Sequence, residues 1–531
     1  IYLDSFKRIV VPGGYRYPDA NKAILAKINE GSLIVNYTGH GGITGLSEEK
    51  ALTIGEIENL NNIHKLPFFI TATCEFSRFD NPGFVSAGER LLLNPNGGAI
   101  ALMTTTRLAF AHSNFAVNRR VYESMFEENK QQMRRLGDII RLSKNPTSTY
   151  IYNFVLLGDP ALRLSYPRYK IEITEINALD PAESDTLGAM SELRVKGKIT
   201  GVNGQTMNDF NGFVYPKFFD KKSRFKTLAN DGASVAANFS YFSKLIYRGK
   251  ASVKNGLFEF NFIIPKDIAY QFGKTKLSLY AFDTIQNTDA GGYFNDLVVG
   301  GFDENAEADT KGPDIEMYLN EPDFQSGDYS SPNPIVYAKL YDPQGIHFLG
   351  QSIGRDITLT LSGPQEGHFY LNEYYQPALD AFDKGTLTFQ LHNLPDGNYK
   401  LTVKAWDLHN NSSEKEIQFV IDTDARLQIT SLKNSPNPFS GSTNIYFQHN
   451  QPNKTLGVTV DIFNQFGAHI KSMTKDLMSS GTSSLPFEWD GTNQTGYRAP
   501  AGLYVYQVSI TNEAGDRFTA GQKLILLPVK E

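Results

Sequence analysis

The sequence predicts an α/β domain followed by a series of all-β sandwich modules. Continuous apolar strands separated by helical segments fill residues 1–168, and short alternating strands with turn residues between them fill the remainder. A chain of 531 residues is also too long for a single hydrophobic core. We therefore expect four regions, with boundaries at 1–168, 169–308, 309–425 and 426–531.

The first region alternates strand and helix. Buried strands are predicted where runs of apolar residues occur, and helices where polar, helix-compatible stretches follow them. Such strands form a parallel sheet with helices on both faces, and right-handed crossovers bring the carboxyl ends of the strands to one edge. The predicted strands are Ser32–Thr38, Pro67–Thr73 and Gly98–Met103, and the predicted helices are Thr53–Asn61, Phe84–Leu93 and Phe115–Glu128.

From Lys170 onward the pattern is that of sandwiches, with no helix of any length. A weak internal repeat divides this region into modules. Asp283 is followed by Asn287, and Asp407 by Asn411, and each pair comes after an alternating strand. A turn made by Asp and Asn explains this spacing without any ligand. We expect two immunoglobulin-like modules divided near Asp309–Pro313.

The last module is predicted to begin at Arg426 and to form a sandwich of its own. In its final strand, alternate apolar residues are expected to share one buried face. These are Tyr504, Tyr506, Val508 and Ile510.

Composition excludes several classes of function. The net charge of -6 provides no basic field, so nucleic acid is not expected as a partner. The single cysteine forbids an internal disulfide and multi-cysteine zinc sites. No Asp-rich loop has a convincing ligand spacing, so we predict no metal and no cofactor. No apolar run reaches membrane-spanning length, and Ile1-Tyr2-Leu3 suggests the interior of a longer domain.

His40 and Cys74 each lie just beyond a predicted parallel strand, one crossover apart. If the two strands are neighbours, both side chains project from the same carboxyl edge of the sheet. An imidazole beside a thiol favours the thiolate, which is the nucleophile of cysteine catalysis. For an arbitrary cysteine a buried, inert thiol is the simpler interpretation. The position of this one, opposite a glycine-flanked histidine, favours a catalytic pair.

Four further assignments follow from this pair. Gly41 lets the backbone turn sharply, and an N–H just after His40, together with the N–H of Cys74, is suited to holding a developing oxyanion. Arg107, at the end of the third strand, is a candidate for the substrate pocket, with an exposed surface arginine as the alternative. Glu75 is a candidate for orienting His40, although adjacent residues at a strand end usually diverge.

Three segments carry a family resemblance. Asn36–Gly42 (NYTGHGG) resembles the histidine motif of the gingipain-type (C25) cysteine peptidases, and Thr71–Phe76 (TATCEF) resembles their cysteine motif. Leu156–Ala161 (LLGDPA) is similar to the closing segment of their catalytic domain. The resemblance covers about residues 1–168 and implies a caspase-like fold with a cysteine nucleophile, a histidine base and cleavage of peptide bonds.

Within that family, one branch matches better than the secreted gingipains. The segments Asn94–Ile100, Asp342–Ile346 and Ser352–Ile357 look like those of type IX secretion sortases, and the last module resembles the FlgD-like sandwich of exported proteins. The resemblance implies an enzyme on the outer-membrane surface of Bacteroidota that removes C-terminal signal domains from cargo proteins. It also implies transfer of cargo to an anionic lipopolysaccharide, and partnership with a PorV-like outer-membrane β-barrel and other surface secretion subunits.

Two other functions stay open. A hydrolytic gingipain-like secreted protease shares the same chemistry up to the acyl-enzyme, and a non-enzymatic surface scaffold or adhesin would carry a degenerate protease module. The presence of both His40 and Cys74 argues against the scaffold. The family's catalytic domain begins upstream of Ile1, so we expect that an acidic residue orienting His40 can lie outside this sequence.

Overall fold

A computed structural model describes residues 1–127, 133–144, 151–177, 186–230, 234–350, 354–478 and 481–528. Glu128, the last residue of one predicted helix, and Ser352 and Ile353 of one resembling segment lie outside the described residues. The chain divides into two compact units, one made of residues 1–168 with 222–241 and the other of 169–221 with 242–531. In the part of the chain that the structure describes, no helix combines the length and apolar character needed to cross a lipid bilayer.

The first unit is built on a four-stranded sheet of order β3-β7-β8-β9, in which β3, β7 and β8 are parallel and β9 is antiparallel. This confirms the predicted α/β fold of the first region. The elements are η1 (Leu3–Ser5), β1 (Ile9–Val11), β2 (Gly14–Arg16), α1 (Pro18–Glu30), β3 (Ile34–Thr38), β4 (Gly41–Gly42), β5 (Gly45–Leu46), β6 (Leu52–Thr53), α2 (Ile54–Glu58), β7 (Phe68–Ala72), α3 (Ala87–Leu93), β8 (Ala101–Thr105), α4 (Ala111–Met125), α5 (Leu136–Ser143) and β9 (Phe154–Leu157).

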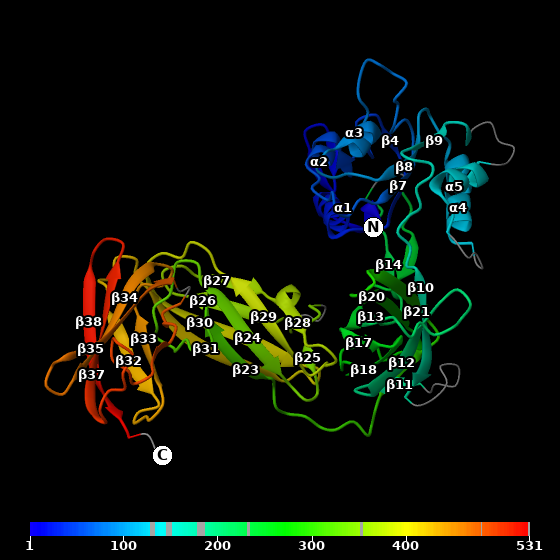
Figure 1. Ribbon diagram of the computed structural model, residues 1–531. Coiled ribbons are helices and arrows are strands. Elements are labelled where there is room, and N and C mark those ends of the chain that lie inside the picture. The colour runs from blue at the N-terminus through cyan, green and yellow to red at the C-terminus, as the bar shows by residue number, and fades with distance from the viewer. Residues whose placement is uncertain are drawn as a thin grey trace. The chain divides into compact units, whose positions relative to one another are not determined.

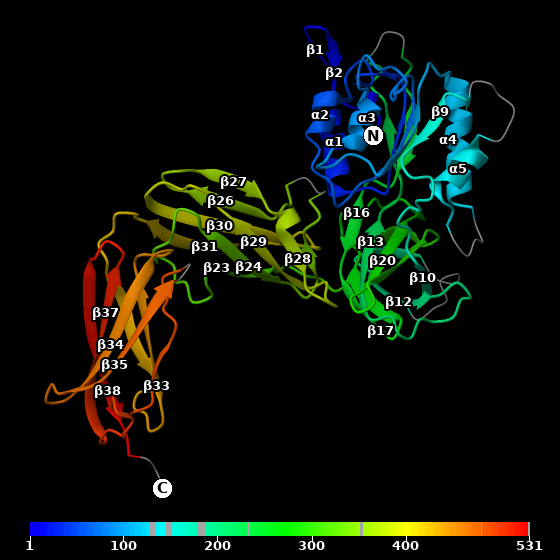
Figure 2. The ribbon, with the colours of Figure 1, turned by 45° about the horizontal axis from the view of Figure 1, so that its top comes forward.

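Helices cover both faces of this sheet (Figures 1 and 2). Successive residues of a strand point to opposite faces, so Phe68 and Ile70 pack with α4 and α5, whereas Phe69 packs with α1, α2 and α3. All five residues of β7 are buried, as are all five of β8. The sheet is therefore the rigid support from which the loops at its carboxyl edge project.

A hairpin from much later in the chain completes the first unit. Its strands, β14 (Ser223–Lys226) and β15 (Asn238–Tyr241), pair antiparallel. The ring of Phe239 lies 4.2 Å from that of Tyr2, and the carboxylate of Asp4 accepts hydrogen bonds of 2.9 Å from the backbone N–H groups of Ala229 and Asn230. The first residues of the α/β unit thus depend on this hairpin for their contacts.

The second unit is all-β and, in its described residues, contains three large hydrophobic cores and one small cluster, which confirms the predicted class of the remaining chain. In the first core, β13 pairs with β20 on one side and with β16 and β17 on the other, so the sheet returns to its starting strand. The strands around this core, of which β11, β22 and β19 form a separate sheet, are β10 (Tyr169–Ile176), β11 (Leu187–Ala189), β12 (Glu192–Thr200), β13 (Gly212–Phe219), β16 (Leu245–Arg248), β17 (Ala251–Lys254), β18 (Leu257–Ile263), β19 (Gly273–Lys274), β20 (Lys276–Asp283), β21 (Thr288–Phe294) and β22 (Val298–Phe302).

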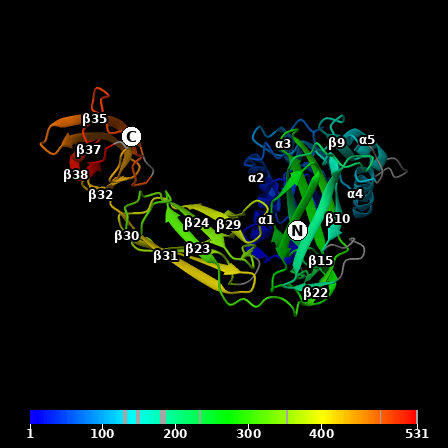
Figure 3. The same ribbon diagram turned by 60° about the horizontal axis from the view of Figure 1, so that its bottom comes forward.

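The second core lies between two sheets, one of order β23-β24-β29-β28 and one in which β30 pairs with β25, β26 and β31 (Figure 3). The predicted turn after β30 is present, because both carboxylate oxygens of Asp407 accept hydrogen bonds from Asn411 at 2.7 Å. The elements are β23 (Asp314–Leu319), β24 (Ile335–Tyr341), β25 (Ile346–His347), β26 (Thr358–Ser362), β27 (Gly367–Tyr370), η3 (Asn372–Tyr374), β28 (Tyr375–Pro377), β29 (Lys384–Gln390), β30 (Gly397–Asp407) and β31 (Ser412–Ile421).

The third core fills a sandwich of a three-stranded and a four-stranded sheet, with orders β32-β33-β36 and β35-β34-β37-β38. The predicted inward face of β37 is confirmed, since its four alternate apolar residues are all buried. The strands are β32 (Ile429–Ser435), β33 (Thr443–His449), β34 (Thr455–Asn464), β35 (His469–Met478), β36 (Phe487–Trp489), β37 (Gly502–Asn512) and β38 (Arg517–Leu526).

A fully buried histidine at the end of β33 makes this last module sensitive to acid. His449 has no exposed surface, its Nδ1 accepts a hydrogen bond from the Gln451 N–H at 3.3 Å, and its Nε2 has no hydrogen-bond partner among the described residues. Burial lowers the pKa of His449 from 6.5 to about 4. Between those two values the unfolded chain binds a proton that the folded module does not, so stability falls as the pH falls.

We expect the free energy of unfolding of this module to fall by up to about 3 kcal/mol between pH 6.5 and pH 4, the size of the pKa shift of His449. Denaturant titrations across that range, in a Trp406→Phe background where the buried Trp489 reports on this module, measure the slope. In His449→Asn, whose amide oxygen can still accept the Gln451 N–H, the His449 contribution to the slope is lost. An unchanged slope in that variant would assign the acid sensitivity to other groups.

Candidate active site

His40 and Cys74 follow two strands that are direct neighbours in the sheet. The parallel register of β3 and β7 pairs Thr38 with Ala72, so each candidate residue comes two positions after a paired residue. The Gly39 N–H extends the pairing by donating to the Ala72 carbonyl at 3.4 Å. The sheet therefore brings the two loops to the same edge, as expected of adjacent parallel strands.

The two loops are in contact just beyond the strands. A methyl group on Gly41 would lie 2.6 Å from Oγ1 of Thr73, a separation that atoms in contact do not tolerate. Only glycine fits at position 41, because Thr73 is fully buried and cannot retreat. The residue after His40 is thereby packed against the residue before Cys74.

The backbone of His40 is fixed while its imidazole is exposed. The His40 carbonyl accepts hydrogen bonds from the Ser47 N–H at 2.8 Å and from the Tyr37 hydroxyl at 2.6 Å. Burial raises the pKa of Tyr37 to about 12, so this hydroxyl keeps the proton that it donates. The imidazole forms no hydrogen bond with any residue that the structure describes, and none joins it to the thiol.

The Cys74 thiol is half-buried and lies against a backbone segment that leads into α4. Its sulfur is 3.4 Å from both the nitrogen and the carbonyl oxygen of Ala109. Ala109 comes two residues before α4, so the sulfur lies near the amino end of a fifteen-residue helix. The sulfur can therefore accept the Ala109 N–H, and the thiol can donate to the Ala109 carbonyl.

Hydrogen bonds to Thr105 and Arg107, at and just after the end of β8, hold the loop that carries Cys74. The Thr105 hydroxyl donates to the Thr73 carbonyl at 2.6 Å, and the Glu75 N–H donates to the Arg107 carbonyl at 3.3 Å. Glu75 has a left-handed φ of 48°, a conformation that is strained for a residue with a side chain. A strained residue directly after a nucleophile is held in place only where the surroundings fix it.

The side chains of Glu75 and Arg107 are both engaged elsewhere. Glu75 forms an ion pair of 3.5 Å with Arg78 rather than contacting His40. Arg107 holds Asp80 through both ends of its guanidinium, with one contact of 2.8 Å, and this hydrogen-bonded pairing lowers the pKa of Asp80. The structure thus brings His40, Gly41 and Cys74 to one edge, and it directs the side chains of Glu75 and Arg107 to partners within the neighbouring loops.

Sequence reasoning missed two features of the site, a backbone N–H donor beside the thiol and a cleft beside His40. The N–H of Ala109 lies in an apolar segment, Leu108–Ala111, where no side chain signals a role in the site. A cleft of about 570 Å³ beside His40 is lined by His40 itself and by residues of the segment 41–55. Its walls come from the short strands β4, β5 and β6, which are too short to produce a recognisable sequence pattern.

Two family models match the chain. Residues 1–165 match peptidase family C25, and residues 433–515 match the FlgD Ig-like domain. Residues 1–165 therefore belong to the gingipain-type peptidase family C25, and the chain carries a cysteine peptidase domain of that family followed by all-β modules. None of the curated protein sequences matches the chain.

Solved structures resemble the chain as well. The crystal structure of dimeric latent PorU from Porphyromonas gingivalis is 29% identical, with a TM-score of 0.36, and the match covers 76% of this chain. The chain spans 39% of the length of that PorU chain. The structure of the arginine-specific cysteine proteinase gingipain R is 16% identical, with a TM-score of 0.26, and the match covers 53% of this chain and 56% of that one.

Proposed function

We propose that this protein is a cell-surface cysteine endopeptidase and transpeptidase, a sortase of the type IX secretion system. It removes the C-terminal signal domain from cargo proteins and transfers the cargo to an anionic lipopolysaccharide. The observation that carries the catalytic part is the placement of His40 and Cys74 after two paired parallel strands of a C25 domain. The sortase part is supported by the resembling segments and by the FlgD Ig-like domain near the end of the sequence.

In this mechanism the imidazole of His40 takes the proton of the Cys74 thiol. The thiolate then attacks the carbonyl carbon of the scissile peptide bond and forms a tetrahedral oxyanion. When that intermediate collapses, the bond to nitrogen breaks, the imidazolium gives its proton to the leaving amine, and a thioester joins the cargo to Cys74. The signal domain leaves with a new amino terminus.

The oxyanion is held by the N–H groups of Gly41 and Cys74. Hydrogen-bonded and non-hydrogen-bonded pairs alternate along an antiparallel ladder. The Ser47 N–H donates to the His40 carbonyl at 2.8 Å, which is one of the two bonds of a hydrogen-bonded pair. The next pair, Gly41 with Leu46, is then a non-hydrogen-bonded pair, so the Gly41 N–H does not donate to β5. This leaves a backbone donor available one residue from the base.

Resolution of the thioester decides between a sortase and a hydrolase. An amine acceptor attacks the thioester carbonyl, His40 accepts the proton of that amine, and an amide forms as the thiolate departs. Water in place of the amine gives a free carboxylate, which is the hydrolytic gingipain-like alternative. We assign the cleft beside His40 to the acceptor, because it opens next to the group that must take the acceptor's proton.

Two proposed substrate contacts take a more specific form. For Arg107 to bind a substrate carboxylate, its ion pair with Asp80 must open, and both side chains are exposed enough for this exchange. Because Glu75 is paired with Arg78, it acts on the substrate only through Arg78.

At the cell surface, a PorV-like outer-membrane β-barrel and other secretion subunits hold the enzyme. Co-purification from outer membranes tests this association.

The test is a cleavage assay on a peptide that joins a cargo end to the start of a signal domain. With increasing concentrations of an amine acceptor, we expect the amide product to replace the carboxylate product, as measured by mass spectrometry. Carboxylate as the sole product at every amine concentration would establish a hydrolase. No product from the folded, full-length protein on any such junction would favour the non-enzymatic scaffold.

A further inference from the structure

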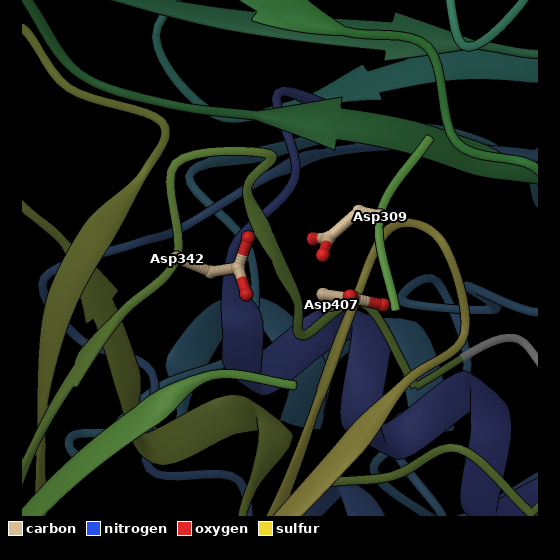
Figure 4. Close-up of side chains that lie close together, drawn as sticks. All are labelled: Asp309, Asp342 and Asp407. Carbon is tan, nitrogen blue, oxygen red and sulfur yellow. The ribbon is translucent and has the colours of Figure 1, made fainter. Parts of the chain in front are cut away.

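Three aspartates from distant parts of the sequence converge at the start of the second sandwich (Figure 4). Asp309 lies in the connection before β23, Asp342 directly follows β24, and Asp407 is the last residue of β30. One carboxylate oxygen from each of the three lies within 4.8 Å of the others. The side chains point toward one another from three separate segments of the chain (Figure 4).

This cluster concentrates negative charge in a buried place. Asp342 is 2% exposed and Asp407 is fully buried, while Asp309 is partly exposed. No ion pair found among the described residues includes any of the three carboxylates. Burial, and then the charges of Asp407, Asp309 and Asp314, raise the pKa of Asp342 to about 7. An uncompensated cluster of this kind is costly to bury.

The hydrogen bonds of the cluster leave one carboxylate oxygen of a buried residue without a donor. Both oxygens of Asp407 accept from Asn411, and Oδ1 of Asp342 accepts the Gln344 N–H at 2.8 Å. Oδ2 of Asp342 accepts no hydrogen bond from any residue that the structure describes. The carboxylate of a residue with 2% exposure normally has partners on both oxygens, so Oδ2 of Asp342 is free to take a cation as its partner.

The corresponding position in the preceding module shows how such an aspartate is satisfied without a ligand. Asp283 ends β20 as Asp407 ends β30, and it is equally buried. Its carboxylate accepts the backbone N–H groups of Asn211, Ile285 and Gln286, and it belongs to no acidic cluster among the described residues. The difference between the two modules is therefore the approach of Asp309 and Asp342 to the second strand end.

We propose that Asp309, Asp342 and Asp407 bind a calcium ion. Two oxygens that coordinate one Ca²⁺ at about 2.4 Å can be separated by up to about 4.8 Å, which matches the spread of the three carboxylates. Oxygen-only ligands suit a hard cation, and Ca²⁺ accepts the irregular geometry of carboxylates from three loops more readily than Mg²⁺ does. Backbone carbonyls and water complete the six to eight ligands that calcium takes.

Such an ion would fasten the segment before β23 to the body of the module. Asp309 is otherwise attached through its carbonyl, which accepts a hydrogen bond from Asn411 at 3.2 Å. The loops that carry the other two ligands are already fixed, since the Asp342 carbonyl accepts the Gly345 N–H and the Leu408 N–H donates to the Gly345 carbonyl. Calcium then adds the bond that orders the connecting segment.

The experiment compares the full chain with Asp342→Asn after treatment with a chelator, using calorimetric titration with CaCl₂ or MgCl₂. We expect one Ca²⁺ per chain to bind the unaltered protein, with weaker Mg²⁺ binding, and the variant to lose more than about tenfold in Ca²⁺ affinity. Hydrogen exchange should slow on Ca²⁺ addition in the segments around Asp309 and Asp342. In Asp314→Asn, which removes a neighbouring carboxylate that pairs with Lys311 outside the cluster, Ca²⁺ affinity should fall far less than in Asp342→Asn, because Asp314 contributes only its charge at a distance.

Thermal unfolding gives a second readout, because the Tm difference between Asp342→Asn and the unaltered chain should change sign when Ca²⁺ is added. Without metal, Asp342→Asn removes repulsion between buried carboxylates, so its Tm should equal or exceed that of the unaltered chain. With Ca²⁺ the order should reverse, because only the unaltered chain gains binding energy. Failure of the unaltered protein to bind Ca²⁺, equal binding by Asp342→Asn, or equal affinity for Mg²⁺ would overturn the assignment.

Discussion

Cys74→Ala abolishes cleavage of a cargo peptide and leaves the fold intact. The change removes the only thiol of the chain, and no neighbouring group can replace a thiolate nucleophile. Loss of the nucleophile of a catalytic triad typically costs several orders of magnitude in rate. The fold is retained because the loop is held by the Thr105 hydroxyl and the Arg107 carbonyl, and the hydrogen bonds of the sulfur among the described residues are with the backbone of Ala109 rather than with a side chain.

The measurement is the single-turnover rate of cleavage, with circular dichroism as the check on folding. Since Cys74 is the sole cysteine, one equivalent of a thiol-alkylating reagent modifies it alone and should inactivate the enzyme in proportion to labelling. Cys74→Ser, which can still accept the Ala109 N–H, is the matched variant and should also be inactive. Cleavage by Cys74→Ala at near the original rate would make this cysteine structural.

His40→Ala lowers the single-turnover rate nearly as much as Cys74→Ala, and the double variant is little worse than either single one. The two side chains follow paired residues of β3 and β7, so we expect them to act as one unit whose effects do not add. In the structure the imidazole is exposed and not bonded to the thiol. Catalytic hydrogen bonds often tighten only when substrate is bound.

The matched control is His64→Ala, an exposed histidine that precedes β7 and so lies toward the opposite end of that strand. It should leave the cleavage rate unchanged. The rate of Cys74 alkylation at neutral pH should fall in His40→Ala and not in His64→Ala. Fully multiplicative losses in the double variant, or normal alkylation of His40→Ala, would contradict a coupled pair.

Strand positions in the peptidase domain could be predicted because long apolar runs form them, and the edge that holds His40 and Cys74 followed directly. The expected burial of Ser32–Thr38 was wrong, because β3 lies at the end of the sheet order and none of its residues is buried. Helix starts were less accurate, since the residues Thr53 and Ser86 were placed inside helices that they cap from outside. The predicted helix at Phe115 begins earlier, at Ala111, because the chain turns into α4 directly after the segment that meets the thiol. Strand β9 was missed, being four residues long and followed by Gly158 and Asp159.

The partners of side chains in loops could not be predicted. Glu75 and Arg107 were candidates for orienting His40 and for lining the pocket, and the sequence did not show that Arg78 and Asp80 would be their partners. The same reason explains why the sequence suggested no metal site, contrary to the calcium site proposed above. Ligand spacing in sequence reveals a site built from one loop, whereas Asp309, Asp342 and Asp407 meet only because separate strand ends converge.

The hairpin β14–β15 also sets an order for events during synthesis. Asp4 finds its backbone donor at Ala229, which the ribosome adds 225 residues later, and the ring of Tyr2 meets that of Phe239 later still. The hairpin is encoded inside the segment for the first all-β core, between β13 and β16. The peptidase domain therefore reaches its final set of contacts only after translation has passed well into the module that follows it.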